Sequence, residues 1–139
     1  MSRPLSLAAK LGYRTGRRLC AVGAGEEWLR RLQDELPDEG PLCAGLEPDA
    51  QYDLVVWWPR RPEEMAPSFA SLLARLSPHG SIWAVIPNRA AARRLRSRLS
   101  FEGLQQAALS LGLVDTKVTK LSEDEYGVRF SLRDELRST

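Results

Sequence analysis

The sequence contains few of the residues that metal sites and disulfide scaffolds require. Its 139 residues include two cysteines and one histidine. Cys20 and Cys43 lie on apolar segments without a Cys-x-x-Cys spacing, which indicates buried thiols rather than zinc or redox chemistry. His79 lies in the turn-forming sequence Ser-Pro-His-Gly, which favours a solvated turn position over a catalytic base. We therefore expect no metal site.

Long apolar runs and a strong charge imbalance are also absent. No run approaches the roughly 20 apolar residues that a membrane-spanning helix needs, and Lys10 interrupts the first apolar stretch too early for a signal peptide. Twenty basic and eighteen acidic residues leave a formal net charge of +2, too small by itself to predict nucleic-acid binding. The sequence therefore predicts a cytoplasmic protein without a membrane partner. Its length predicts one domain over residues 1–139.

Apolar segments alternate with amphipathic helical segments along the chain. The early candidate strands are apolar throughout, which is typical of strands covered on both faces, whereas the last two alternate and predict an antiparallel hairpin. This order predicts an α/β, Rossmann-like three-layer sandwich with a mostly parallel sheet of about six strands. We expect helices over residues 5–11, 26–36, a segment ending near Leu76, and 100–111, and strands over residues 18–22, 41–44, 52–58, 81–87, 113–121 and 126–132.

Three stretches resemble class I methyltransferases: residues 52–56, 76–82 and 111–113. In that superfamily they match the fourth strand, the turn into the fifth strand, and the helix end before the final hairpin. The chain also resembles a bacterial family of short proteins of unknown function, which implies a truncated methyltransferase-like fold in a bacterial cytoplasm and brings no activity. The matching stretches are residues 9–12, 82–87, 111–118 and 126–130, of which Gly-Leu-Val-Asp-x-Lys-Val is the most specific.

Two positions depart from that short bacterial family. Asn88 and Arg89 stand where a lysine is expected after Pro87, and Tyr126 stands where a tryptophan is usual. Any function that depends on these positions is therefore in question in this chain.

The glycine-rich turn that would approach a nucleotide cofactor is incomplete. Gly23 and Gly25 follow the first strand, but Glu-Glu-Trp occupies residues 26–28, where a third small residue would permit close approach. The two glutamates also oppose a phosphate at the helix N-terminus. Glu47 follows the weak second strand and is a candidate acceptor for ribose hydroxyls. Gly23, Gly25 and Glu47 are thus the candidates for S-adenosylmethionine, but the broken fingerprint predicts that no cofactor binds.

Two further segments are candidate binding surfaces. Trp57, Trp58 and Arg60 lie at and just past the end of the best strand, where ligands bind in open α/β sheets. The alternative is one tryptophan in the core and one on the surface. Residues 89–98 hold five arginines and no acid, and on a helix some of these arginines would share an anion-binding face. The anion-binding candidates are Arg89, Arg93, Arg94 and Arg96.

A solvated helix face is the favoured interpretation of the arginine run, because the net charge is small and no aromatic residues interleave. The leading functional hypothesis is a non-enzymatic protein that binds a small ligand or a protein partner, with a degenerate methyltransferase-type cofactor site. The alternatives are a minimal S-adenosylmethionine-dependent methyltransferase and an anion or nucleic-acid binder acting through the arginines. No pair of residues has the spacing of a nucleophile and its base, so no catalytic residue is assigned.

Overall fold

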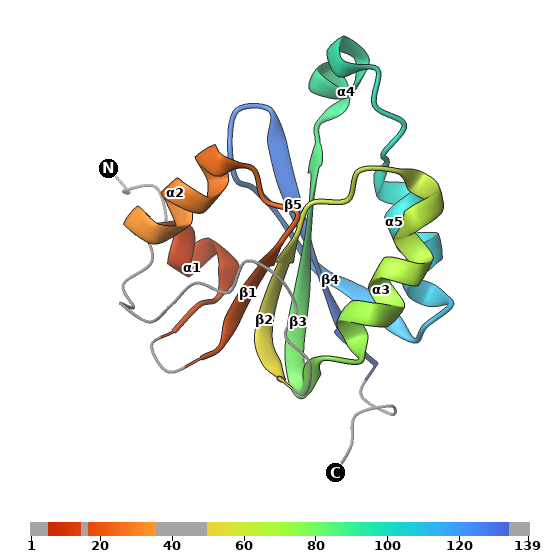
Figure 1. Ribbon diagram of the computed structural model, residues 1–139. Coiled ribbons are helices and arrows are strands. Elements are labelled where there is room, and N and C mark those ends of the chain that lie inside the picture. Colours follow the sequence, from red (N-terminus) through yellow and green to blue (C-terminus); the bar gives the residue numbers. More distant parts are fainter. Residues whose placement is uncertain (1–5, 15–16, 36–49, 134–139) are drawn as a thin grey trace.

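The computed structural model describes residues 6–14, 17–35 and 50–133. Its centre is one five-stranded sheet in the order β1-β2-β3-β5-β4 (Figure 1). The first three of these neighbours pair in parallel, and β5 pairs antiparallel with both β3 and β4. The predicted α/β sheet with a C-terminal antiparallel hairpin is therefore confirmed, while the strand predicted at residues 41–44 lies outside the described residues. The strands are β1 (Leu19–Val22), β2 (Tyr52–Trp57), β3 (Leu76–Pro87), β4 (Leu113–Lys120) and β5 (Glu125–Leu132).

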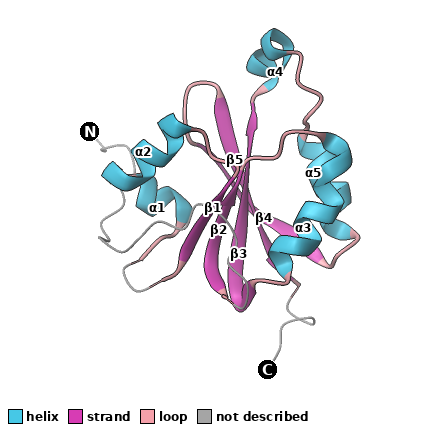
Figure 2. Cartoon of the chain, viewed as in Figure 1, coloured by secondary structure: helices cyan, strands magenta, loops and turns pink. Residues whose placement is uncertain are grey.

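Helices cover both faces of the sheet (Figure 2). One face packs against α1 (Leu7–Leu11) and α2 (Glu26–Glu35), and the other packs against α3 (Met65–Leu73) and α5 (Phe101–Leu109). A 3₁₀ turn, η1 (Pro62–Glu64), precedes α3, and α4 (Arg89–Leu95) follows the end of β3. The three-layer arrangement explains why the parallel strands carry no polar alternation.

Each face of the sheet has its own packed core. On the α3 and α5 side, the ring of Phe69 lies edge-on to Trp57 and Phe130, with ring centroids 4.8 and 5.1 Å apart. On the α1 and α2 side, Trp83 is fully buried and its Nε1–H donates to the carbonyl oxygen of Leu11 at 2.9 Å. The sheet therefore supports both cores, because neighbouring residues of one strand face opposite layers.

Serine side chains cap the N-termini of two helices. Ser100 accepts a hydrogen bond from the Gly103 N–H at 3.1 Å and begins α5. Ser6 caps α1 in the same way, and Gly12 ends that helix in the left-handed region at φ 74°.

One predicted boundary is wrong. Leu76 was expected at the end of a helix, with a turn over residues 77–80 before the next strand. Instead α3 ends at Leu73 and Leu76 already pairs with Tyr52, whose N–H donates to the Arg75 carbonyl at 2.8 Å. The Ser77 hydroxyl donates to Asp53 at 2.8 Å, so polar side chains hold the start of β3 against β2. The apolar spacing of Leu76 fits either element, and only the long-range pairing decides between them.

Candidate functional site

A glycine turn lies at the carboxyl end of β1, beside the end of β2. Gly23 has φ 80°, and a Cβ there would lie 3.0 Å from the carbonyl oxygen of Trp58. The Trp58 N–H donates to the Val22 carbonyl at 2.9 Å, so the two strand ends approach closely at this point. Only glycine fits position 23 without strain, since both the backbone angle and the space exclude a side chain.

Gly25, by contrast, borders open space. A Cβ at this position would meet no heavy atom of the described residues within 4 Å. The Gly25 carbonyl accepts a hydrogen bond from the Leu29 N–H at 3.0 Å, so α2 begins directly after this residue. The turn therefore presents an unobstructed surface beside the start of α2.

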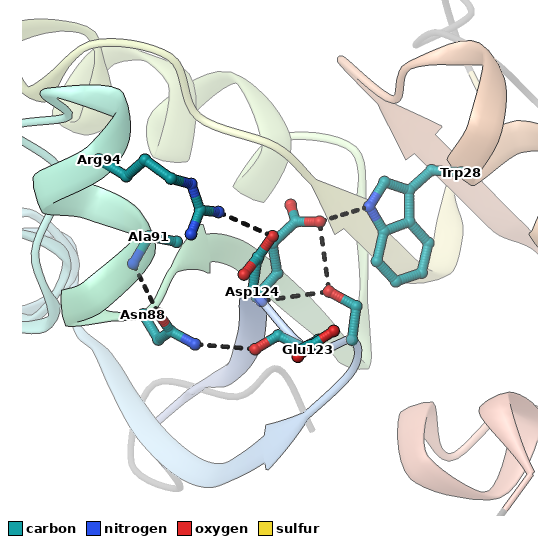
Figure 3. A network of polar contacts seen from close by, with 8 residues as sticks. Trp28, Asn88, Ala91, Arg94, Glu123 and Asp124 are labelled. Carbon is teal, nitrogen blue, oxygen red and sulfur yellow. Dashed lines mark hydrogen bonds and ion pairs between the residues drawn. The ribbon is translucent and has the colours of Figure 1, made fainter.

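Trp28 does not fill that space. Its ring packs against Trp58 with centroids 5.4 Å apart, and the guanidinium of Arg31 lies 4.6 Å above it. Its Nε1–H donates to Glu125 Oε1 at 2.9 Å, across the chain on the hairpin of β4 and β5 (Figure 3). Trp28 is thus held as a wall beside the glycine turn.

Both tryptophans at the end of β2 are buried, which corrects the alternative of one core and one surface residue. Trp57 and Trp58 are 5% and 9% exposed and belong to the cores on opposite faces of the sheet. The physical reason is that the hydrogen bonding between β1 and β2 reaches Trp58, so the side chains of these consecutive residues lie on opposite faces, and helices cover both faces. The Nε1–H of Trp58 is buried and finds no acceptor among the described residues. Arg60 is exposed.

A cavity of about 260 Å³ opens next to the glycine turn on the α3 side. Val22 and Trp57 line it from the ends of β1 and β2, and Ser68 and Ser71 line it from α3. Its volume is slightly below the range of about 300–1,000 Å³ that is usual for sites enclosing a whole small molecule, so it suits part of a ligand. The wall formed by α3 was not predicted, although Ser68 and Ser71 have the i, i+3 spacing of one helix face.

The arginine run forms α4 and the loop after it. Arg94 pairs with Asp124 at 2.9 Å, and Arg98 pairs with Glu63 at 3.4 Å. Arg89, Arg93 and Arg96 are exposed and form no ion pair within the described part of the chain. Because Arg96 adopts a left-handed conformation at φ 55°, it ends α4, so the predicted helical face reaches only from Arg89 to Arg94.

Tyr126 lies at the same end of the sheet, opposite Ile86 in the pairing of β3 with β5. Burial raises the pKa of its phenol above the usual 10.0, and the Glu102 carboxylate raises it further, while Arg89 lowers it. The phenol therefore stays neutral at physiological pH.

The remaining predictions concern the cysteines, Glu47, metal binding and membrane-spanning helices. Cys20 is buried, as expected, whereas Cys43 and the ribose candidate Glu47 lie outside the described residues. Within the described ranges, no group of three or more His, Cys, Asp or Glu side chains could hold a metal ion. None of the helices described is long and apolar enough to cross a membrane.

The parallel strands, the glycine turn after β1 and the antiparallel hairpin at one edge of the sheet form a fold that solved S-adenosylmethionine-dependent methyltransferases share. A S-adenosylmethionine-dependent methyltransferase from Aquifex aeolicus matches with TM-score 0.67 and 15% identity, over 89% of this chain and 86% of that one. A magnesium protoporphyrin IX methyltransferase from Synechocystis PCC 6803 with bound SAH matches with TM-score 0.58 and 9% identity, over 85% and 74%. A glycopeptide N-methyltransferase complexed with sinefungin matches with TM-score 0.59 and 12% identity, over 91% and 90%.

No family model matches the sequence, and no curated protein matches it. The structural matches confirm the resemblance to class I methyltransferases at the level of the fold. They contradict the expectation of no cofactor, because neighbours of this fold are solved with SAH and with sinefungin. They also support the methyltransferase alternative more than the leading non-enzymatic hypothesis.

Proposed function

We propose that this chain binds S-adenosylmethionine at the carboxyl ends of β1 and β2 and acts as a methyltransferase. The observation that carries the proposal is the open space at Gly25, directly after the turn at Gly23, together with the cavity that Val22 and Trp57 line at the same strand ends. In open α/β sheets, ligands bind at this edge, outside the carboxyl ends of the parallel strands. We further propose a cytoplasmic setting, as the sequence predicts.

The glutamates after the turn do not oppose this ligand. Glu26 and Glu27 lie exposed in the first turn of α2 and disfavour a phosphate there. S-adenosylmethionine has no phosphate, and its sulfonium and ammonium groups outweigh its one carboxylate. The charge that argues against a dinucleotide therefore favours this cofactor.

Several groups of the chain fit the cofactor's chemistry. The buried Nε1–H of Trp58 lacks an acceptor among the described residues, and such a donor favours a ligand that brings one. Trp57 and Val22 offer apolar surface in the cavity, suited to an aromatic or apolar ligand part. Glu47 remains our proposed acceptor of ribose hydroxyls, on the sequence alone.

When bound, S-adenosylmethionine supplies an electrophilic methyl group. The chain's residues would bind and orient the cofactor, and the packed wall of Trp28 and Trp58 would exclude water on one side. Among the described residues we assign no general base, so we propose an acceptor that presents its own lone pair.

Calorimetric titration of the full chain with S-adenosylhomocysteine tests the proposal. We expect measurable binding by the wild type and at least about a tenfold loss in Gly25→Leu, because the new side chain occupies the open space without left-handed strain. Ala74→Leu is the matched control, since Ala74 is exposed at the end of α3 beside Arg75, at the opposite edge of the sheet.

Circular dichroism should show that both variants fold. Absence of binding by the wild type, or equal affinity in wild type and Gly25→Leu, would refute the proposed site. Equal losses in the two leucine variants would also refute it.

A further inference from the structure

The arginines of α4 form a surface whose chemistry the cofactor site does not explain. We infer that the methyl acceptor is a phosphate-bearing small molecule, held by Arg89, Arg93 and Arg96 at the mouth of the site. This inference rests on the proposed function, because it names the substrate class of the same site.

Positive charge is concentrated in one part of the chain. Residues 65–101 contain no acidic residue, although the whole chain has nearly balanced charges. Five arginines lie within residues 89–98 of that stretch. The positive charge is therefore local to α4 and the loop after it, and acidic residues of the same segment cannot neutralise it.

Contacts with the turn between β4 and β5 fix the position of α4. We call residues 122–125, which connect β4 to β5 and include the first residue of β5, the hairpin turn. The Asn88 N–H donates to the Asp124 carbonyl at 2.8 Å, and the Asn88 side-chain amide donates to the Glu123 carbonyl at 3.0 Å. Arg94 pairs with the Asp124 carboxylate at 2.9 Å (Figure 3). These contacts order α4 before any ligand arrives, which lowers the entropy cost of binding.

The turn that holds α4 also contacts the wall of the proposed cofactor site. The same hairpin turn supplies Glu125, which accepts the hydrogen bond of Trp28 in α2 (Figure 3). Moreover, α4 follows the carboxyl end of β3, the edge of the sheet that carries the glycine turn after β1 (Figure 1). One turn therefore positions both the arginine helix and the wall of the proposed cofactor site.

Some arginines of this segment form ion pairs and others do not. Arg94 and Arg98 have carboxylate partners, whereas Arg89, Arg93 and Arg96 have none within the described residues. Unpaired guanidinium groups on an ordered helix and at its C-terminal cap suit phosphate, because they donate several charge-assisted hydrogen bonds to its oxygens. Leu95 is 64% exposed among them and adds apolar surface for the rest of the acceptor.

A small molecule fits this surface better than a nucleic acid. The patch is confined to one short helix and its C-terminal loop, and α4 carries no aromatic side chain on which bases could stack. The net charge of +2 gives no wider basic groove.

Titration of the full chain with inorganic pyrophosphate tests the inference. We expect binding that weakens between about 50 and about 200 mM salt, as phosphate contacts require. In Arg93→Gln/Arg96→Gln we expect about a tenfold loss of pyrophosphate affinity. The matched control is Arg14→Gln/Arg30→Gln, which removes the same charge from exposed positions in the loop after α1 and in α2 and should bind as the wild type does.

Unchanged affinity in Arg93→Gln/Arg96→Gln, an equal loss in the control, or tighter binding of citrate than of pyrophosphate would each overturn the inference. Tighter binding of a single strand of about 16 nucleotides would assign the surface to nucleic acid instead. A parallel titration with S-adenosylhomocysteine separates this inference from the proposed function, since Arg93→Gln/Arg96→Gln should leave that affinity unchanged. Pyrophosphate binding without S-adenosylhomocysteine binding would refute the proposed function and the acceptor role while leaving an anion site. S-adenosylhomocysteine binding without pyrophosphate binding would refute the anion site alone.

Discussion

Trp28 shows how one side chain can serve both stability and a binding site. Its ring lies between Trp58 and the guanidinium of Arg31, and its Nε1–H donates to the carboxylate of Glu125. We predict that Trp28→Phe lowers the free energy of unfolding by about 2 kcal/mol, because it keeps an aromatic ring but loses a hydrogen bond to a charged group. Chemical denaturation followed by circular dichroism measures this change.

A double-mutant cycle with Glu125→Ala isolates that contact. In the Glu125→Ala background, Trp28→Phe should cost clearly less than in the wild type, since the carboxylate acceptor is already gone. If Trp28→Phe costs the same in both backgrounds, the hydrogen bond contributes nothing to stability and the tryptophan is held by packing alone.

For single residues, the sequence predicts the local backbone conformation more readily than the distant contact partner. The spacing of Gly23 and Gly25 after an apolar strand is enough to predict a turn, and Gly23 has the positive φ that such a turn needs. The partner of Trp28 could not be predicted, because Glu125 is 97 positions away in the sequence. Nor could the burial of Trp58, which depends on α2 packing over it.

Helix α4 is an element whose order depends on its cap. Asn88 Oδ1 accepts the Ala91 N–H at 2.9 Å while its amide group donates to the hairpin turn. We predict that Asn88→Ala destabilises α4 by about 1–2 kcal/mol, because both side-chain contacts are lost. Amide hydrogen exchange should then accelerate in α4 while β3 keeps its protection.

The matching control for α4 is Ser100→Ala, which removes the equivalent cap of α5. That variant should accelerate exchange in α5 and leave α4 unchanged. Equal protection of α4 in Asn88→Ala and in the wild type would show that Arg94 and the backbone contacts of Asn88 suffice to order the helix.

Element types followed from the sequence more reliably than element ends. Ser100 is a strong capping residue, and the helix after it begins where predicted. The end of α4 could not be predicted, because Arg96 takes a left-handed conformation that arginine rarely adopts. The start of β3 was also missed, since Leu76 gains its place by pairing with a distant strand.

For the whole molecule, apolar patterning predicted the layers and not the basis of recognition. Strands without polar alternation must be covered on both faces, and they are. The expectation of no cofactor came from a glycine motif that serves to bind phosphate groups. A sulfonium cofactor has no phosphate, so it does not require the residues after Gly25 to be free of negative charge. The cavity beside Trp57 could not be predicted, because it depends on how α3 packs across two strand ends.

The two cores share one sheet, and this predicts a single cooperative unfolding transition. Phe69 lies in the core beside α3 and α5, and Trp83 lies in the core beside α1 and α2, each with 0% exposure. We predict that Phe69→Leu and Trp83→Phe each lower the free energy of unfolding by about 1–3 kcal/mol. In both variants, tryptophan fluorescence and far-ultraviolet circular dichroism should report the same shifted midpoint, because strands β2 and β3 contribute side chains to both cores. Two separated transitions in either variant would show that the layers unfold independently, and the expectation of one domain over residues 1–139 would then be wrong.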